Sequence, residues 1–157
     1  MKPNIGITPE HLKGVTEILT EVLATQVVLY TKLRKFHWNV YGESFMEYHL
    51  LFEAQYKELE EAIDETAERI SKLGSSVIGT TAEFAEKSVI KEAPGKYPTS
   101  LEMVKELLAD HELAIRSLRE GIDKCDDELG DKGTADFLTN LMQAHETMAW
   151  KLRRYFK

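Results

Sequence analysis

The sequence contains few of the residues that cross-link a chain or break its helices. One cysteine, four prolines and nine glycines occur in 157 residues. Because Cys125 has no second cysteine to pair with, a disulfide-stapled scaffold is excluded and a reducing compartment is favoured. The longest stretches without a charged residue, such as 22–31, are ten residues long, about half the length of a membrane helix. Residues 1–8 carry no apolar core like that of a signal peptide, so we expect a cytoplasmic protein with no membrane span.

The charge balance is acidic. Twenty-seven acidic side chains stand against twenty basic ones, which gives a net charge of −7. Binding of nucleic acid depends on clustered lysine and arginine side chains that neutralise phosphates, so this balance disfavours it. An acidic surface is compatible with attracting cations instead.

Four long segments repeat their apolar residues at the spacing of a helix. They run through residues 9–38, 44–73, 99–129 and 138–155. Polar caps mark three of the helix starts. These caps are Thr8 before Pro9, the capping box of Ser44 with Glu47, and the capping box of Thr99 with Glu102. We expect the stripe from Phe45 to Leu73 to be buried, and Cys125 to be a buried apolar residue rather than a nucleophile.

A connection of about two dozen residues joins the second helix to the third. Residues 74–98 are too many for a bundle turn, and 81–88 within them have the pattern of a short helix. A long crossover in the middle of four helices is the plan of a ferritin-like bundle. We therefore predict an all-α, ferritin-like four-helix bundle that forms a single domain over 1–157, with a short N-terminal tail at 1–7.

Four side chains of metal-ligand type stand out in the region of the first turn and the second helix: His37, His49, Asp64 and Glu68. Imidazole and carboxylate suit a borderline first-row ion such as iron or zinc. The fifteen residues from His49 to Asp64 span about 22 Å along the helix axis. Around that axis these two lie within roughly 60° of each other, and Glu68 follows one turn later on the same side. They share a face, but one metal ion cannot bridge them within a chain.

Two antiparallel copies of this helix would bring the ligand types together. If the copies pack about a two-fold axis near Lys57, His49 of one chain comes level with Asp64 and Glu68 of the other, as in an isologous dimer. His37 joins His49 across the short turn between the first two helices. We therefore predict two sites per dimer, each built from both chains. The alternative is two ordinary histidines and scattered surface charges, since Asp and Glu are common on solvated helix faces.

The sequence predicts no metal site inside the bundle. His111 and His145 lie on the core stripes of the third and fourth helices, with no carboxylate three or four residues away on the same stripe. Carboxylate-bridged di-iron bundles use Glu-x-x-His, but the residues three before the five histidines are of other types. They are Thr8, Arg34, Met46, Leu108 and Met142. We expect core histidines with satisfied hydrogen bonds here.

One set of residues resembles the signature of the Dps family, the mini-ferritins that protect DNA during starvation. It comprises Lys35, Phe36, His37, Trp38, Asn39, Val40, Tyr41, Gly42, Phe45, His49, Phe52, Glu53, Tyr56, Asp64, Ala67, Glu68 and Arg69. The helix order, the crossover and the segment 150–153 are also similar to Dps, so the resemblance covers nearly the whole chain. It implies a hollow dodecameric shell with tetrahedral symmetry that oxidises iron(II), preferentially with hydrogen peroxide, stores the ferric mineral and protects against oxidative damage.

The resemblance also implies roles for individual residues. His37 and His49 of one chain, with Asp64 and Glu68 of its two-fold mate, would be the ligands of an inter-subunit di-iron ferroxidase site. Zinc is an alternative ion for the same ligand types. Glu53 stands where the family often has a further carboxylate.

Other residues would support this chemistry. Trp38 stands at the position of a site-adjacent tryptophan that can take up an oxidising equivalent. Lys35 and Arg69 are candidates to support the ligands, with solvated surface charge as the alternative. Iron would enter through acidic pores near the start of the last helix, where Asp131 and Asp136 are the candidates. Asp131 is equally suited to cap that helix.

The sequence departs from the family in its tail. DNA-binding members of the family often carry a lysine-rich flexible tail, whereas the residues before Thr8 include only Lys2. Direct binding of DNA is therefore not expected. Asp127 and Glu128 are separate, further candidates for the acidic pore. Two other functions stay open: a DNA-compacting shell with incidental iron chemistry, and a structural shell without catalysis.

Overall fold

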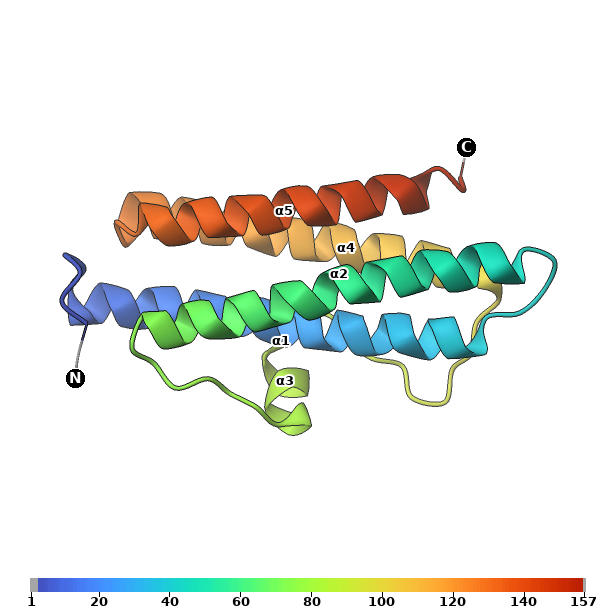
Figure 1. The fold of residues 1–157 in the computed structure, drawn as a ribbon, viewed down its shortest axis with the longest axis horizontal. Coiled ribbons are helices and arrows are strands. Elements are labelled where there is room, and N and C mark those ends of the chain that lie inside the picture. The colour runs from blue at the N-terminus through green and yellow to red at the C-terminus, as the bar shows by residue number, and fades with distance from the viewer. Residues whose placement is uncertain (1–2, 157) are drawn as a thin grey trace.

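The computed structural model describes residues 3–156, and the helices account for most of them. The elements are α1 (Pro9–Asn39), α2 (Phe45–Lys72), α3 (Thr81–Lys87), α4 (Ser100–Asp123), the π-helical turn η1 (Lys124–Glu128) and α5 (Lys132–Arg153). Figure 1 shows α1 beside α2 and α4 beside α5, with the two pairs stacked into a bundle. This arrangement confirms the predicted all-α, ferritin-like fold. None of the helices in this described part is long and apolar enough to cross a membrane.

Local chemistry sets most of the helix ends. The Thr8 hydroxyl accepts a hydrogen bond from the His11 amide at 3.2 Å, and the predicted capping box of Thr99 with Glu102 is present. Gly74, with φ of +84°, follows the end of α2. A Cβ added to this glycine would lie 2.6 Å from the Pro3 ring, so the predicted tail packs against the end of α2 from Pro3 on. Residues 1 and 2 of that tail lie outside the described part.

Two predictions about the start of α2 are wrong. Ser44 makes no side-chain cap, since its backbone (φ −97°, ψ 28°) lies outside the extended region typical of an N-cap. The Glu47 carboxylate accepts a hydrogen bond from the Tyr155 hydroxyl near the other end of the chain. Phe45, the first residue of α2, is 38% exposed rather than buried. The start of α2 is therefore held by a long-range contact rather than by its own cap.

The crossover between α2 and α4 packs along α1. It contains α3, which begins with a capping box of Thr80 and Glu83 and lies beside α1 in Figure 1. The Val89 amide donates to the Thr25 hydroxyl at 3.2 Å, which ties the next stretch of the crossover to the same helix. The predicted short helix in the long connection is confirmed.

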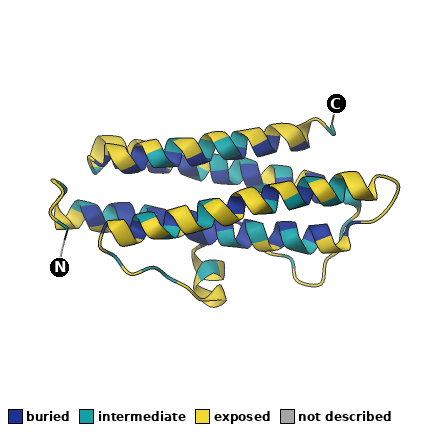
Figure 2. Ribbon diagram, viewed as in Figure 1, coloured by how far each residue is buried: buried dark blue, intermediate teal, exposed yellow. Residues whose placement is uncertain are grey.

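The core consists of two apolar clusters that follow each other along the bundle. Phe36 and Phe52 are fully buried in the first cluster, and Leu19, Ile70 and Cys125 in the second. The burial of Cys125 confirms its predicted place in the core. Figure 2 shows the buried faces of the long helices turned toward one another.

Candidate metal centre

His37 and His49 lie face to face where α1 ends and α2 begins. His37 is in the last turn of α1, and His49 is in the first turns of α2. The connection through residues 40–44 is short enough to bring the two rings together. Their centroids are 3.6 Å apart and the ring planes meet at 20°. The predicted contact across the turn is therefore present.

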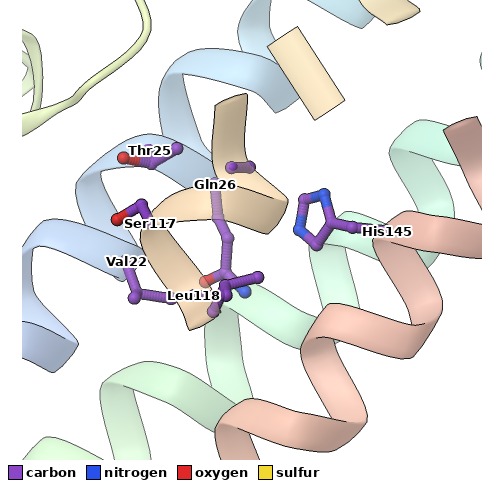
Figure 3. A pocket seen from close by; sticks show the side chains of 7 residues that line it. Val22, Thr25, Gln26, Ser117, Leu118 and His145 are labelled. Atoms are coloured by element: carbon purple, nitrogen blue, oxygen red, sulfur yellow. The ribbon is translucent and has the colours of Figure 1, made fainter. Parts of the chain in front are cut away.

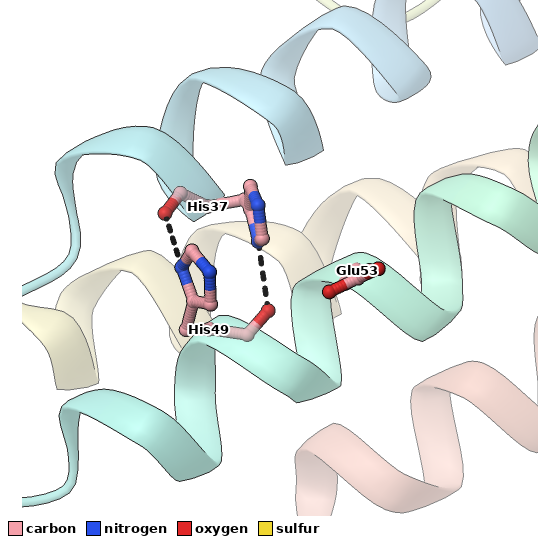
Figure 4. Close-up of side chains that lie close together, drawn as sticks. All are labelled: His37, His49 and Glu53. Atoms are coloured by element: carbon pink, nitrogen blue, oxygen red, sulfur yellow. Dashed lines mark hydrogen bonds between the residues drawn. The ribbon is translucent and has the colours of Figure 1, made fainter.

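Main-chain carbonyls fix both rings. His37 Nδ1 donates to the His49 carbonyl at 2.8 Å, and His49 Nδ1 donates to the His37 carbonyl at 2.9 Å, as the dashed lines in Figure 4 show. A carbonyl can only accept, so each Nδ1 carries the proton of the neutral ring. Each Nε2 is then left with its lone pair, which is the form in which imidazole binds a metal.

Glu53 completes a group of three possible ligands. It follows His49 by one turn of α2, and Figure 4 shows its carboxylate beside the two rings. Ligand atoms of His37, His49 and Glu53 all lie within 4.8 Å of one another. Glu53 also pairs with Lys57 on the next turn, and this contact lowers the pKa of the Glu53 carboxyl. The carboxylate is therefore ionised and able to bind a cation.

Asp64 and Glu68 lie further along α2 and are exposed to solvent. Neither belongs to the group formed by the two histidines and Glu53, and Glu68 forms an ion pair with Lys72 at 3.0 Å. Within one chain, the structure thus brings together only part of the predicted ligand set.

Tyr56, which the sequence analysis named in the Dps-like set without giving it a role, contacts His37. The Tyr56 ring stands edge-on to His37, with 5.3 Å between centroids. Arg34 lies over Tyr56 at 4.7 Å and over Trp38 at 5.4 Å, while Trp38 itself is 65% exposed. Tyr56 follows His49 by seven residues, so their shared helix face was the signal that could have identified it.

Comparison with known proteins places the chain in a family. Residues 16–157 match the ferritin-like domain. An uncharacterised low temperature-induced protein of Nostoc sp. (strain PCC 7120) is 44% identical over 98% of this chain and 86% of its own. DNA protection during starvation protein 2 of Bacillus anthracis is 37% identical over 91% of this chain and 97% of its own. The chain belongs to the Dps family. A solved Dps protein of Vibrio cholerae O1, described as a member of a broad superfamily of ferritin-like diiron-carboxylate proteins, superposes with a TM-score of 0.92 at 26% identity, covering 99% of this chain and 97% of that one.

Membership of the Dps family connects the chain with iron storage, iron oxidation in general and protection against stress. It also indicates a homo-oligomer. In this Dps chain the paired histidines and Glu53 form the one group of three close metal-ligand side chains among residues 3–156. The donor set of two imidazoles and a carboxylate fits a first-row divalent ion.

The two basic residues named as candidates to support the ligands have other partners in this Dps chain. Lys35 donates to the Ala93 carbonyl at 3.0 Å, in the crossover. Arg69 donates to the Asp131 carboxylate at 3.3 Å and to the Thr134 hydroxyl at 2.9 Å, at the start of α5. These contacts connect α1 and α2 to distant parts of the chain rather than to the histidines.

The pore candidates differ in exposure. Asp131 is 4% exposed and caps α5, because its carboxylate accepts from the Thr134 amide at 3.0 Å. Asp136, in the first turns of α5, is exposed, as are Asp127 and Glu128 in η1. Of the two leading candidates, only Asp136 has a carboxylate free to face solvent in the single chain.

Proposed function

We propose that this Dps chain oxidises iron(II), preferentially with hydrogen peroxide, and stores the ferric product inside a dodecameric shell. Each ferroxidase site uses His37, His49 and Glu53 of one chain together with Asp64 and Glu68 of its two-fold mate. The observation that carries the proposal is the stacked histidine pair with both Nε2 atoms free. Iron is the substrate here, and zinc competes for the same ligands.

The position of the acidic residues supports a site shared between chains. Asp64 and Glu68 are exposed on the same helix that carries His49, about 22 Å and about 28 Å further along. A two-fold axis near Lys57 relates the two ends of that helix in an antiparallel pair. Each histidine pair then meets the acidic end of the partner helix, and the symmetry creates two equal sites.

Two irons at one site would allow hydrogen peroxide to be reduced by two electrons together. Two iron(II) ions supply both electrons that hydrogen peroxide needs, so that two iron(III) ions and two water molecules form with the uptake of two protons. No hydroxyl radical is released, because that radical forms when peroxide accepts a single electron, and here it accepts two at the same site. A set of few oxygen and nitrogen ligands leaves coordination positions open for peroxide, as a redox site requires.

The first experiment measures iron oxidation directly. Iron(II) and hydrogen peroxide are mixed anaerobically with the assembled protein, and ferric absorbance is followed. Replacing His37 and Asp64 together by alanine should slow the reaction by at least about tenfold, since loss of groups around a metal commonly costs that much. A matched control replaces His11 and Glu65, which lie outside the proposed site. An unchanged rate in the first variant removes the assignment.

A complementation experiment tests whether the site is shared. One variant lacks His37 and His49, and the other lacks Asp64 and Glu68. Random association of equal amounts makes half of the dimers mixed, and each mixed dimer regains one of its two sites, so about a quarter of the wild-type activity should return. A site contained within one chain would regain none. The mass of the assembled protein, measured alongside, tests the dodecamer.

A shell that binds and compacts DNA is the second candidate function, because the relatives include proteins named for DNA protection. The net charge of −7 opposes it, and Arg153 in the basic C-terminal segment already pairs with Glu112 at 2.8 Å. We infer that protection acts through removal of iron and peroxide in the cytoplasm. A gel shift at low and physiological salt decides, since tight binding with a steep salt dependence would contradict this inference.

A further inference from the structure

Four buried polar side chains interrupt the apolar core, one from each long helix. They are Gln26 of α1, Gln55 of α2, His111 of α4 and His145 of α5. All four are at most 2% exposed. Among the described residues, all buried side-chain nitrogen and oxygen atoms that lack a hydrogen-bond partner belong to this layer. They are both amide atoms of Gln26, Oε1 of Gln55 and Nε2 of His111.

Gln26, His111 and His145 lie where the two apolar clusters meet, whereas Gln55 lies within the first cluster, between Phe52 and Leu59. On α1, Gln26 lies between Leu23 of one cluster and Val28 of the other. On α5, His145 lies between Leu141 and Met148, again one from each cluster. Bundle proteins build their internal ligand sites from side chains of facing helices at such a position. The unpartnered atoms therefore need an explanation other than poor packing at a chain end.

The two histidines form a neutral pair. Their Nδ1 atoms are 3.0 Å apart, so one ring donates a proton to the other. Burial lowers the pKa of both imidazoles, with that of His145 at about 4. Each ring therefore carries a single proton at neutral pH. Whichever ring uses its Nδ1 proton in the pair presents a bare Nε2, and the other presents Nε2 with its proton.

A small cavity lies between Gln26 and His145. Figure 3 shows these two side chains facing it from opposite sides, with Ser117 and Thr25 nearby. The space open to the centre of a water molecule is about 10 Å³, which is room for one. No aspartate, glutamate, lysine or arginine lines the cavity. The lining is suited to a small neutral molecule that both donates and accepts hydrogen bonds, and unsuited to an ion.

We propose that one ordered water molecule occupies this cavity and bridges the amide of Gln26 and the imidazole of His145. His145 donates Nε2–H to the water, and the water donates to Gln26 Oε1. His111 then donates its Nδ1 proton to His145 Nδ1. The atoms left without partners are Gln26 Nε2, His111 Nε2 and Gln55 Oε1. The last two are acceptors, which are less rarely unpaired in proteins than buried N–H groups.

The water links α1 to α5 at the middle of the bundle. Without it, the Gln26 side chain and the Nε2–H of His145 would each lose hydrogen bonds to bulk water with no replacement. With it, the α1–α2 pair is bound to the α4–α5 pair by a directional contact between two apolar clusters. This contact is independent of the metal centre and of the proposed iron chemistry.

A crystal structure of the assembled protein is the direct test. We expect a peak of water density within hydrogen-bonding distance of Gln26 and of His145 Nε2. An empty cavity, a direct bond between the two side chains, or a peak with the anomalous signal of a metal would each overturn the proposal.

A substitution at Gln26 provides an independent test, because it should lower the midpoint of thermal unfolding if the cavity holds water and raise it if the cavity is dry. Gln26→Met replaces the amide by an apolar group of similar length, and the exposed Gln143→Met serves as the matched control. If the cavity holds water, the variant leaves His145 without its bridge, and the midpoint of thermal unfolding falls by roughly 3 °C or more. If the cavity is dry, the change removes two unpaired atoms and the midpoint rises. A midpoint at or above that of the wild type therefore refutes the bridging water.

Discussion

Asp131 holds the start of α5 to α2, and its removal should destabilise the protein whatever its effect on iron. The carboxylate accepts from the Thr134 amide at 3.0 Å, from the Thr134 hydroxyl at 2.6 Å and from Arg69 at 3.3 Å. Asp131→Ala removes a helix cap and leaves the hydroxyl of fully buried Thr134 without its acceptor. The Arg69 side chain is 26% exposed, so water replaces part of its lost contact. We expect a loss of about 2–3 kcal/mol in the free energy of unfolding.

The assay is urea unfolding at one fixed protein concentration, because oligomer stability depends on concentration. Asp131→Asn keeps an oxygen for the cap and should lose only about 1 kcal/mol. Asp136→Asn, at an exposed position of the same helix, should leave stability unchanged and slow iron entry if Asp136 lines a pore. If Asp131→Ala unfolds like the wild type but takes up iron slowly, the buried network is unimportant and Asp131 belongs to the pore.

Three further predictions follow from buried or contacting side chains. Burial lowers the pKa of His111 and His145 below the unfolded value of 6.5, so the unfolded chain binds protons first as pH falls. The free energy of unfolding should thus fall between pH 6.5 and 4 by up to about 1.4 kcal/mol per pH unit for each histidine. In His145→Leu, the free energy of unfolding measured with urea should depend less steeply on pH. Tyr56→Phe, but not Trp38→Phe, should abolish a tyrosyl radical signal in electron paramagnetic resonance after excess peroxide, because Tyr56 contacts His37; an equal signal in Tyr56→Phe would contradict this. Burial raises the pKa of the Cys125 thiol to about 11, so a colorimetric thiol reagent should react only after unfolding, and rapid labelling of the native protein would show the thiol to be accessible.

The helix pattern could be predicted from sequence where the deciding contacts are local. Thr8, Thr99 and Gly74 act within a turn of their own positions, and the structure confirms all three. The predicted capping box of Ser44 and Glu47 is absent: the Ser44 backbone is not extended, and the Glu47 carboxylate binds the hydroxyl of Tyr155, which is 108 residues away. The π-helical turn η1 was not predicted either, since its i→i+5 bonding has no local residue signature.

At the metal centre, too, the contacts set by local sequence were predicted and the contacts set by distant residues were not. The contact of His37 with His49 follows from a short turn and was predicted, whereas the proton positions on the rings depend on two main-chain carbonyls that sequence does not locate. Arg69 was a candidate to support the ligands, with solvated surface charge as the alternative, but its partner Asp131 caps α5 and lies 62 residues away. For the buried histidines, core placement was correct and satisfied hydrogen bonding was wrong, because His111 Nε2 has no protein partner. The ligand roles of Asp64 and Glu68 stay predictions.

The reciprocal hydrogen bonds between the two histidines determine which ligand side chains must rearrange when an ion binds. Both rings are held in place by backbone atoms before a cation arrives, so coordination costs them almost no rotamer freedom. Glu53 is different, since its carboxylate is engaged by the Lys57 ammonium and must exchange that partner for the incoming ion. The Lys57 ammonium therefore competes with the cation for the Glu53 carboxylate. A divalent ion displaces the ammonium from this carboxylate more readily than a monovalent ion of the same size.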